Sequence, residues 1–288
     1  MKATGCYVVT LAFLAFMLGC PHIRAWGIDG HLTICKIAQS RLSKAAEAAV
    51  KGLLPAQAEG DLGSMCSWAD RVRFRYHWSA PLHFINTPHL CSFKYSRDCK
   101  DADGVADRCV AGAVNNYTSQ LLGHGRGASE SDYNQTEALL FLSHFMGDIH
   151  QPLHVSFADD KGGNTIDVRW YRRKSVLHHV WDADIIETAE ERYYDSAPDG
   201  LIEAIQQNIT SKWQDEVEKW ESCGRNKTAC PDVYASEGIQ AACQWAYKGV
   251  RENSVLEDDY FLSRLPVIYK RLAQGGVRLA SVLNRIFE

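Results

Sequence analysis

Two pairs of histidine and aspartate, each inside an apolar segment, constrain the fold of this chain more than any other feature. His144 and Asp148 lie four residues apart in EALLFLSHFMGDIHQPLH, and His178 and Asp182 lie four apart in LHHVWDADI. Residues four apart share one face of an α-helix, so each pair places an imidazole beside a carboxylate. Such groups are costly to bury without partners, so the fold must bring partners to them.

Further histidines and aspartates stand in similar apolar surroundings: Asp70 in SWADRV, His83 in PLHFIN, and His154 just beyond Pro152. For one isolated pair, a structural hydrogen bond is the simpler interpretation. The whole set, however, offers more imidazole and carboxylate ligands than one zinc ion requires. We therefore predict a cluster of zinc ions bridged by a carboxylate, a site suited to phosphodiester hydrolysis. Other histidines lack the pattern and are assigned to surface or supporting positions: His77, His89, His124, His150 and His179.

The first 25 residues have the layout of a secretory signal peptide. Lys2 precedes an apolar run that ends at Leu18, and small residues lead up to Ala25. The run is shorter than the roughly 20 residues that a membrane-spanning helix needs, and no later stretch approaches that length. We expect cleavage after Ala25, a mature chain of residues 26–288 that begins at Trp26, and no membrane anchor.

Cysteine usage points to an oxidising compartment. Of the ten cysteines, Cys6 and Cys20 leave with the signal peptide, and the even number that remains predicts four disulfides. Metal binding by cysteine is the alternative, but no CxxC spacing occurs. Four acceptor sequences for N-glycosylation fit the same compartment and predict a glycoprotein: Asn116, Asn134, Asn208 and Asn226.

The net charge excludes broad electrostatic binding of nucleic acid. The chain carries a formal charge of −4, and loss of Lys2 and Arg24 with the signal peptide makes the mature protein more acidic. A protein that neutralises many phosphates with its own side chains is basic. If this chain acts on nucleic acid, the attraction must be local and supplied by metal.

Apolar residues recur at helical spacing in five segments, whereas strand alternation is scarce. The helical segments are 34–54, 137–145, 201–220, 238–250 and 260–283. Only 163–173 alternates β-branched and aromatic residues with polar ones, which predicts a short strand or hairpin arm. No linker or repeat divides the chain. We expect a mainly α fold, a single compact helical domain with at most a small β-hairpin.

These motifs resemble those of the zinc-dependent single-strand-specific nucleases of fungi and plants, particularly the plant bifunctional (type I) nucleases. The resemblance covers the mature chain from WGIDGH to RLAQGGVRLASVLNRIF. Between these ends the specific motifs occur in order: WAD, PLHFIN, FLSHFMGDIHQPLH, GGNTI, LHHVWD and ACPDVYASEG.

The resemblance implies three zinc ions, with Asp148 shared by two of them and Asp70 orienting the attacking water. The implied ligand sets are Asp70, His83, His144 and Asp148; His154, His178 and Asp182; and the α-amine and carbonyl of Trp26 with His31 and Asp148. The implied disulfides are Cys35 to Cys66, Cys91 to Cys243, Cys99 to Cys109 and Cys223 to Cys230.

Base recognition in the family uses residues just after the PLH histidine and the GGN turn, here Phe84, Asn86, Gly163 and Asn164. Many relatives have aspartate where this chain has Asn86. A carboxylate accepts two hydrogen bonds from a guanine edge, whereas an amide donates and accepts, so the base preference is open. The alternative interpretation is that Phe84 belongs to the core and GGN is only a tight turn.

The implied activity is hydrolysis of single-stranded RNA and DNA to 5′-phosphate products, with 3′-nucleotidase activity on 3′-nucleotides. We expect a monomer of the secretory pathway, with an extracellular, vacuolar or endoplasmic reticulum destination. Two alternatives stay open. Zinc-dependent bacterial phospholipases C are similar in metal ligands and fold, and a non-catalytic secreted glycoprotein could use zinc structurally.

Overall fold

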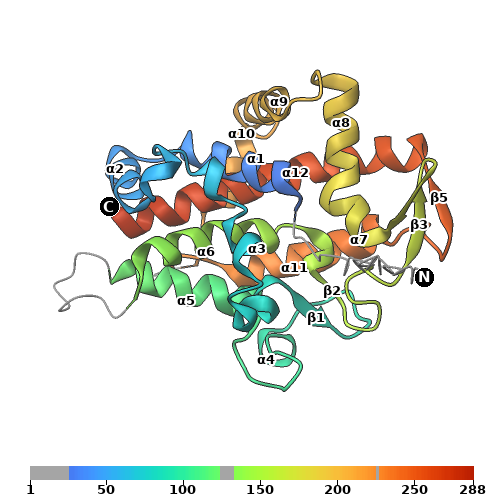
Figure 1. The fold of residues 1–288 in the computed structure, drawn as a ribbon, viewed down its shortest axis with the longest axis horizontal. Coiled ribbons are helices and arrows are strands. Elements are labelled where there is room, and N and C mark those ends of the chain that lie inside the picture. The colour runs from blue at the N-terminus through green and yellow to red at the C-terminus, as the bar shows by residue number, and fades with distance from the viewer. Residues whose placement is uncertain (1–25, 124–132, 225–226) are drawn as a thin grey trace, which may run out of the picture.

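The computed structural model describes residues 26–123, 133–224 and 227–288 (Figure 1). The predicted signal peptide, His124 and the sequon at Asn226 lie outside these residues. The described part is mainly helical, as predicted, with short strands at its edges. None of the helices in these ranges is both long and apolar enough to cross a bilayer.

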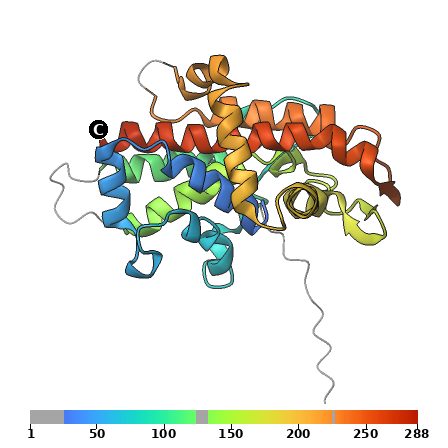
Figure 2. The same cartoon turned by 90° about the horizontal axis from the view of Figure 1, so that it is seen from above.

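The C-terminal helix α12 (Asp258–Phe287) is the axis of the fold. It runs along the molecule beside α1 (Ile28–Gln39), and both α5 (Val110–Leu122) and α6 (Gln135–Asp148) pack against it (Figures 1 and 2). Helices α1 and α12 approach closely at Gly276 of α12 because glycine has no side chain. A Cβ at this position would lie 2.5 Å from a methyl group of Ile37 in α1. The helices that carry His31, His144 and Asp148 thus pack against one common helix.

The remaining helices surround this centre. They are α2 (Lys44–Leu53), α3 (Trp68–Val72), α4 (Tyr95–Asp98), α7 (Leu177–His179), α8 (Ile185–Tyr193), α9 (Pro198–Thr210), α10 (Gln214–Glu221) and α11 (Pro231–Ala241). Short 3₁₀ turns cover Ala56–Ala58, Gly63–Met65, His77–His83 and Pro152–His154, and π turns cover Val180–Asp184 and Ala242–Ala246.

Two of the expected helical segments are divided in the structure. Segment 34–54 forms α1 and α2, because Ser43 caps a new helix by accepting a hydrogen bond from the amide of Ala46. Segment 201–220 forms α9 and α10. Apolar periodicity continues across such breaks, so it did not reveal them.

The strands form two small sheets. In one, β1 (Ile85–Thr87) is parallel to β2 (Val155–Phe157), with Ile85 opposite Val155. In the other, β3 (Asp167–Trp170) pairs antiparallel with β4 (Arg173–Val176) and parallel with β5 (Ser254–Leu256). The β3–β4 pair is the hairpin predicted around 163–173. The β1–β2 pair matters for the site because it brings His83, two residues before β1, next to His154, the residue before β2.

Within the described ranges there are four disulfides, as predicted, and they join the pairs named above: Cys35–Cys66, Cys91–Cys243, Cys99–Cys109 and Cys223–Cys230. Cys35–Cys66 ties α1 to the segment that leads into α3. Cys91–Cys243 joins residues 152 apart in sequence and so connects the two halves of the chain.

Candidate metal centre

Helix α6 carries His144 and Asp148, which lie in the buried centre of the molecule. Asn134 caps the helix by accepting a hydrogen bond from the amide of Glu137, and the helix is buried from Ala138 to its end. His144 and Asp148 are both 0 % exposed. A carboxylate and an imidazole at this depth require compensating partners.

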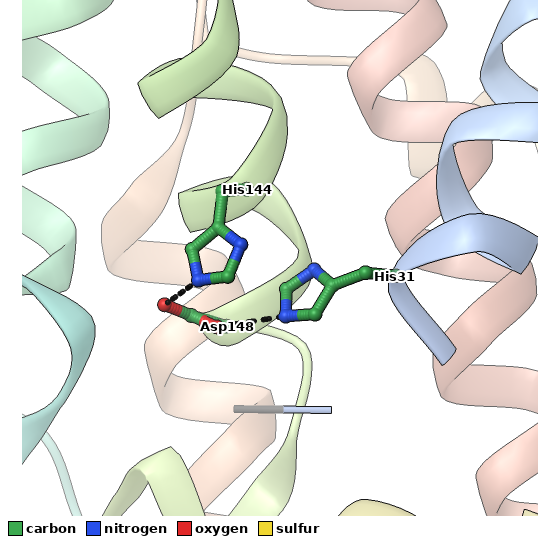
Figure 3. A group of neighbouring side chains, drawn as sticks. All are labelled: His31, His144 and Asp148. Carbon is green, nitrogen blue, oxygen red and sulfur yellow. Dashed lines mark ion pairs between the residues drawn. The ribbon is translucent and has the colours of Figure 1, made fainter. Parts of the chain in front are cut away.

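One group, here the His31 group, contains His31, His144 and Asp148 (Figure 3). The Nε2 atom of His31 lies 3.4 Å from Asp148 Oδ1, and the Nε2 atom of His144 lies 3.3 Å from Asp148 Oδ2. The two oxygens of one carboxylate therefore face two different imidazoles. This arrangement suits a carboxylate shared by two cations.

A second group, the Asp70 group, contains Asp70, His83 and His144. Asp70 Oδ1 lies 3.7 Å both from His83 Nδ1 and from His144 Nε2. His83 Nδ1 also lies 3.0 Å from Asp148 Oδ2, so Asp148 adjoins this group as well. The side chain of Asp70 is 13 % exposed, whereas that of Asp148 is fully buried, so Asp70 is the carboxylate that solvent can reach.

A third group, the His154 group, contains His154, His178 and Asp182. His178 Nε2 lies 3.2 Å from Asp182 Oδ2 and also 3.2 Å from His154 Nε2. His178 belongs to α7 and Asp182 to the π turn that follows. Single π turns inside helices often occur at functional sites.

Backbone carbonyls fix the orientation of three imidazoles. The Nδ1–H groups of His144, His154 and His178 donate to the carbonyl oxygens of Cys66, His83 and Gly162 at 2.9, 2.7 and 2.7 Å. Each ring then presents an Nε2 lone pair to the cluster, as metal-binding histidines do. The facing lone pairs of His154 and His178 repel each other unless a cation lies between them.

The environment keeps several of these imidazoles neutral. Burial lowers the pKa of His31 and of His83 well below the usual value, and nearby histidines add to the effect. Burial and the proximity of His178 lower the pKa of His154 to about 3. Neutral imidazole is the form that binds metal ions. Burial also raises the pKa of Asp148 to about 7, so its anionic form needs a nearby positive charge.

The N-terminal end of the described chain lies against the His154 group. The amide of Gly27 donates to the carbonyl oxygen of Asp182 at 2.7 Å, and Trp26 is 0 % exposed. Gly30 makes room for Trp26, because a Cβ at this position would lie 2.8 Å from the Trp26 Cβ. Neither ring nitrogen of His31, one turn later, has a hydrogen-bond partner among the described residues.

Comparison with known proteins identifies the family. The sequence profile of the S1/P1 nuclease family matches residues 26–288. The chain belongs to the S1/P1 nuclease family. It is 64% identical to Endonuclease 2 of Arabidopsis thaliana, over 98% of this chain and 98% of that protein, and 55% identical to Endonuclease 4 of the same plant, over 91% and 89%. It is 32% identical to Nuclease P1 of Penicillium citrinum, over 91% and 97%.

Of the residues expected to bind the base, two follow a predicted ligand of this S1/P1 family chain in sequence, and two form a turn that is hydrogen-bonded to another predicted ligand. Phe84 and Asn86 directly follow His83, and Asn86 is exposed on β1 opposite Ser156. Phe84 is half-buried and lies outside the fully buried core. Gly163, at φ +81°, accepts a hydrogen bond from the amide of His178. GGN is thus a tight turn beside a predicted ligand, and the Asn164 side chain donates to the carbonyl oxygen of Lys161 within that turn.

Gln151 supports the centre and was not recognised in the sequence. It is fully buried, its amide donates to Asp182 Oδ1, and its oxygen accepts from the amide of Leu153. These bonds hold Asp182 relative to the turn that carries His154. Its position between His150 and Pro152, inside the ligand-bearing motif, was the available signal.

His150, assigned above to a surface or supporting position, is a buried supporting residue. Its Nδ1–H donates to the Met146 carbonyl oxygen, and its Nε2 accepts from Arg278 at 3.0 Å. Arg271 donates to the His150 carbonyl oxygen, and both arginines bind Glu237. Two buried arginines seven residues apart on α12 therefore anchor the turn after Asp148.

Proposed function

We propose that this chain is a secreted, zinc-dependent endonuclease that cleaves single-stranded RNA and DNA to 5′-phosphate products and removes phosphate from 3′-nucleotides. The observation that carries the proposal is the meeting of three buried His/Asp groups around Asp148. The printed names of the relatives, which are endonucleases and nucleases, support the same class of activity.

The donor set fits zinc. Imidazole nitrogens and carboxylate oxygens are the ligands of catalytic zinc, and all cysteines of the described chain that could compete are in disulfides. The His31 nitrogens, which have no hydrogen bond within the described part of the chain, and the facing nitrogens of His154 and His178 are the atoms that a cation would satisfy. We propose three ligand sets: Asp70, His83, His144 and Asp148; His154, His178 and Asp182; and His31 and Asp148 with the α-amine and carbonyl of Trp26. Asp148 is the residue that two sets share.

Zinc in such a site lowers the pKa of bound water to about 7 and offsets negative charge on phosphate oxygens. The side chains of the protein position the reacting groups. Asp70, the solvent-accessible carboxylate, accepts a hydrogen bond from the attacking water and orients it toward phosphorus. Burial holds the pKa values of His31 and His154 below their usual range, so these two imidazoles stay neutral and do not repel the cations that they would hold. Phosphorus is attacked in line with the departing 3′-oxygen, which leaves a 5′-phosphate on the other fragment.

The preference for unpaired strands follows from the position of Phe84. Phe84 is half-buried and directly follows His83 in the chain, so its ring is the proposed stacking partner of one base, and the exposed Asn86 is the proposed partner of the edge of that base. A base within a duplex is already stacked and paired, so it must leave the helix first. The cost of that step disfavours duplex substrates.

The activity is tested by digesting single-stranded RNA, single-stranded DNA and 3′-AMP with purified protein, with and without a chelator. We expect hydrolysis of all three, loss on chelation and recovery with zinc. The Asp148→Asn variant should fold but show little activity, because an amide is a poor ligand shared by two dications. Hydrolysis of phosphatidylcholine faster than of RNA would favour the phospholipase alternative. A folded, zinc-loaded protein inactive on every substrate would favour the structural glycoprotein.

The compartment is part of the proposal. Four disulfides fit an oxidising compartment, and the family match begins at Trp26, the expected first residue after signal cleavage. We propose entry into the secretory pathway, with an extracellular, vacuolar or endoplasmic reticulum destination, and action as a monomer. N-terminal sequencing of the protein purified from its source should begin at Trp26. A sequence that begins at Met1 would contradict signal cleavage.

A further inference from the structure

The GGN turn is bound on one side to a predicted metal ligand. The carbonyl oxygen of Gly162 accepts a hydrogen bond from His178 Nδ1 at 2.7 Å, and the amide of His178 donates to the carbonyl oxygen of Gly163 at 3.3 Å. Gly162 and Gly163 have φ of +68° and +81°, and a Cβ on Gly162 would lie 2.5 Å from the Leu153 carbonyl oxygen. His178 and the two glycines therefore fix this side of the turn.

The other side of the turn is held by Asp160, which is neither a predicted metal ligand nor a residue expected to bind the base. Its Oδ1 atom accepts a hydrogen bond from the amide of Gly163 at 2.8 Å and another from the Tyr247 hydroxyl at 3.0 Å. A hydrogen bond from a backbone amide to a carboxylate is charge-assisted and stronger than a neutral one. Asp160 thus fixes Gly163, the residue just before Asn164.

Tyr247 is held in place by strand β2. Ser156 Oγ lies 2.6 Å from the Tyr247 hydroxyl oxygen, and Ser156 is the donor because that hydroxyl donates to Asp160. The Tyr247 ring stacks on Phe157 with centroids 4.8 Å apart. Burial raises the pKa of Tyr247, so the hydroxyl keeps the proton that it donates. Since Ser156 lies opposite Asn86 in the β1–β2 pair, these contacts connect the GGN turn to the strands that carry Asn86.

We propose that Asp160 and Tyr247 are positioning residues that keep Asn164 where it contacts the base, and that they thereby strengthen the binding of nucleotides over sugar phosphates. The inference rests on the proposed function, because it takes Asn164 as a base-binding residue. Without Asp160, the Gly163 amide loses its acceptor and the turn is free to move at Asn164, whereas His178 still holds the opposite side. Base binding should weaken, and the metal centre should not change.

The test compares Asp160→Ala with wild type on 3′-AMP and on ribose 3-phosphate, which has no base. We expect the KM for 3′-AMP to rise about tenfold with little change in kcat, because a charge-assisted hydrogen bond is lost. The KM for ribose 3-phosphate and the zinc content should stay the same. Asp160→Asn should show a smaller rise, because its amide oxygen still accepts a hydrogen bond.

Two further variants isolate the hydrogen bonds. The matched control is Asp159→Ala, which removes the same charge from the exposed neighbouring residue and should change neither KM. Tyr247→Phe keeps the ring on Phe157 and removes the hydroxyl, so it should raise the KM for 3′-AMP even if Asp160→Ala fails to fold. In a folded Asp160→Ala background, Tyr247→Phe should have little further effect, because both changes act through the same hydrogen bonds.

Binding of adenosine, the nucleoside product from 3′-AMP, gives a readout that needs no catalysis. Its Kd, measured by titration calorimetry, should rise about tenfold in Asp160→Ala and stay unchanged in Asp159→Ala. Equal KM and Kd in wild type and Asp160→Ala would refute the inference and leave the nuclease activity standing. An equal rise in KM for both substrates, or a loss of zinc, would make Asp160 merely structural and also refute it. A wild type inactive on every substrate would refute the proposed function, and adenosine binding alone would then decide the role of Asp160.

Discussion

Gly147 offers a way to disturb the metal centre without replacing any ligand. It precedes Asp148 in α6, and a Cβ at this position would lie 2.6 Å from Nδ1 and 2.7 Å from Cε1 of His31. Real Cβ contacts are essentially never shorter than 3.0 Å, so Gly147→Ala must displace the His31 ring. That ring has no free space, since it is fully buried and stacks on His144 with centroids 4.0 Å apart.

Two opposing contributions set the effect on stability. Replacing glycine by alanine inside a helix stabilises it by about 1 kcal/mol. Forcing a methyl into a packed site costs about 1 to 3 kcal/mol, so we expect a net loss of stability of up to about 2 kcal/mol. The effect on the site should be larger. Displacement of His31 from Asp148 should reduce bound zinc from three ions to two and lower turnover at least about tenfold.

Thermal unfolding, zinc content and 3′-AMP hydrolysis measure these effects. The matched control is Gly52→Ala in α2, where an added Cβ meets nothing within 4 Å. It should raise stability by about 1 kcal/mol and leave zinc and turnover unchanged. Three zinc ions and full turnover in Gly147→Ala would refute the assignment of His31 as a ligand.

Three further predictions concern base preference, the N-terminus and pH. Asn86→Asp should shift the relative rates on the four ribohomopolymers and spare 3′-nucleotidase activity, and an unchanged preference would make Asn86 structural. An additional Gly-Ser before Trp26 converts the α-amine of Trp26 into an amide, which is a poor metal ligand. The extended protein should therefore hold two zinc ions and lose most of its turnover. Equal zinc content and turnover in the extended and correctly cleaved forms would contradict this prediction. Burial, then repulsion from Asp29 and Glu187, raises the pKa of Glu190 from 4.5 to about 7, so the folded state keeps a proton that the unfolded state has lost. The contribution of Glu190 to stability should therefore fall as pH rises from 4.5 to about 7. Glu190→Gln should remove this contribution and, above pH 7, be more stable than wild type by about 1 to 2 kcal/mol. Denaturant unfolding of both proteins across this pH range measures the difference. Parallel curves of unfolding free energy against pH for the two proteins would contradict the prediction.

The parts of the fold that the sequence predicted are those where one periodic pattern covers a whole element. Helix α6 and the long helix α12 were recognised because apolar residues follow a helical repeat along most of their length. Helix α5 was not, because VAGAVNNYTSQLL mixes small and β-branched residues that weaken the pattern, and its burial comes from packing against α6.

The same distinction applies to the metal centre. His144 with Asp148 and His178 with Asp182 were identifiable because i, i+4 spacing is local. The hydrogen bond of Gln151 to Asp182 and that of Arg278 to His150 join residues far apart in sequence, so only the folded chain reveals them. Gly147 is similar, because its importance depends on the position of His31 in another helix.

The central claim is that three zinc ions are bound by the three ligand sets given under the proposed function, two of which share Asp148. The most direct measurement is anomalous diffraction from crystals of the mature protein at wavelengths on both sides of the zinc edge. We predict three zinc peaks, one in each of the Asp70, His154 and His31 groups, with two of them adjoining Asp148. A fully active enzyme with fewer than three zinc peaks, or with zinc remote from Asp148, would contradict the account.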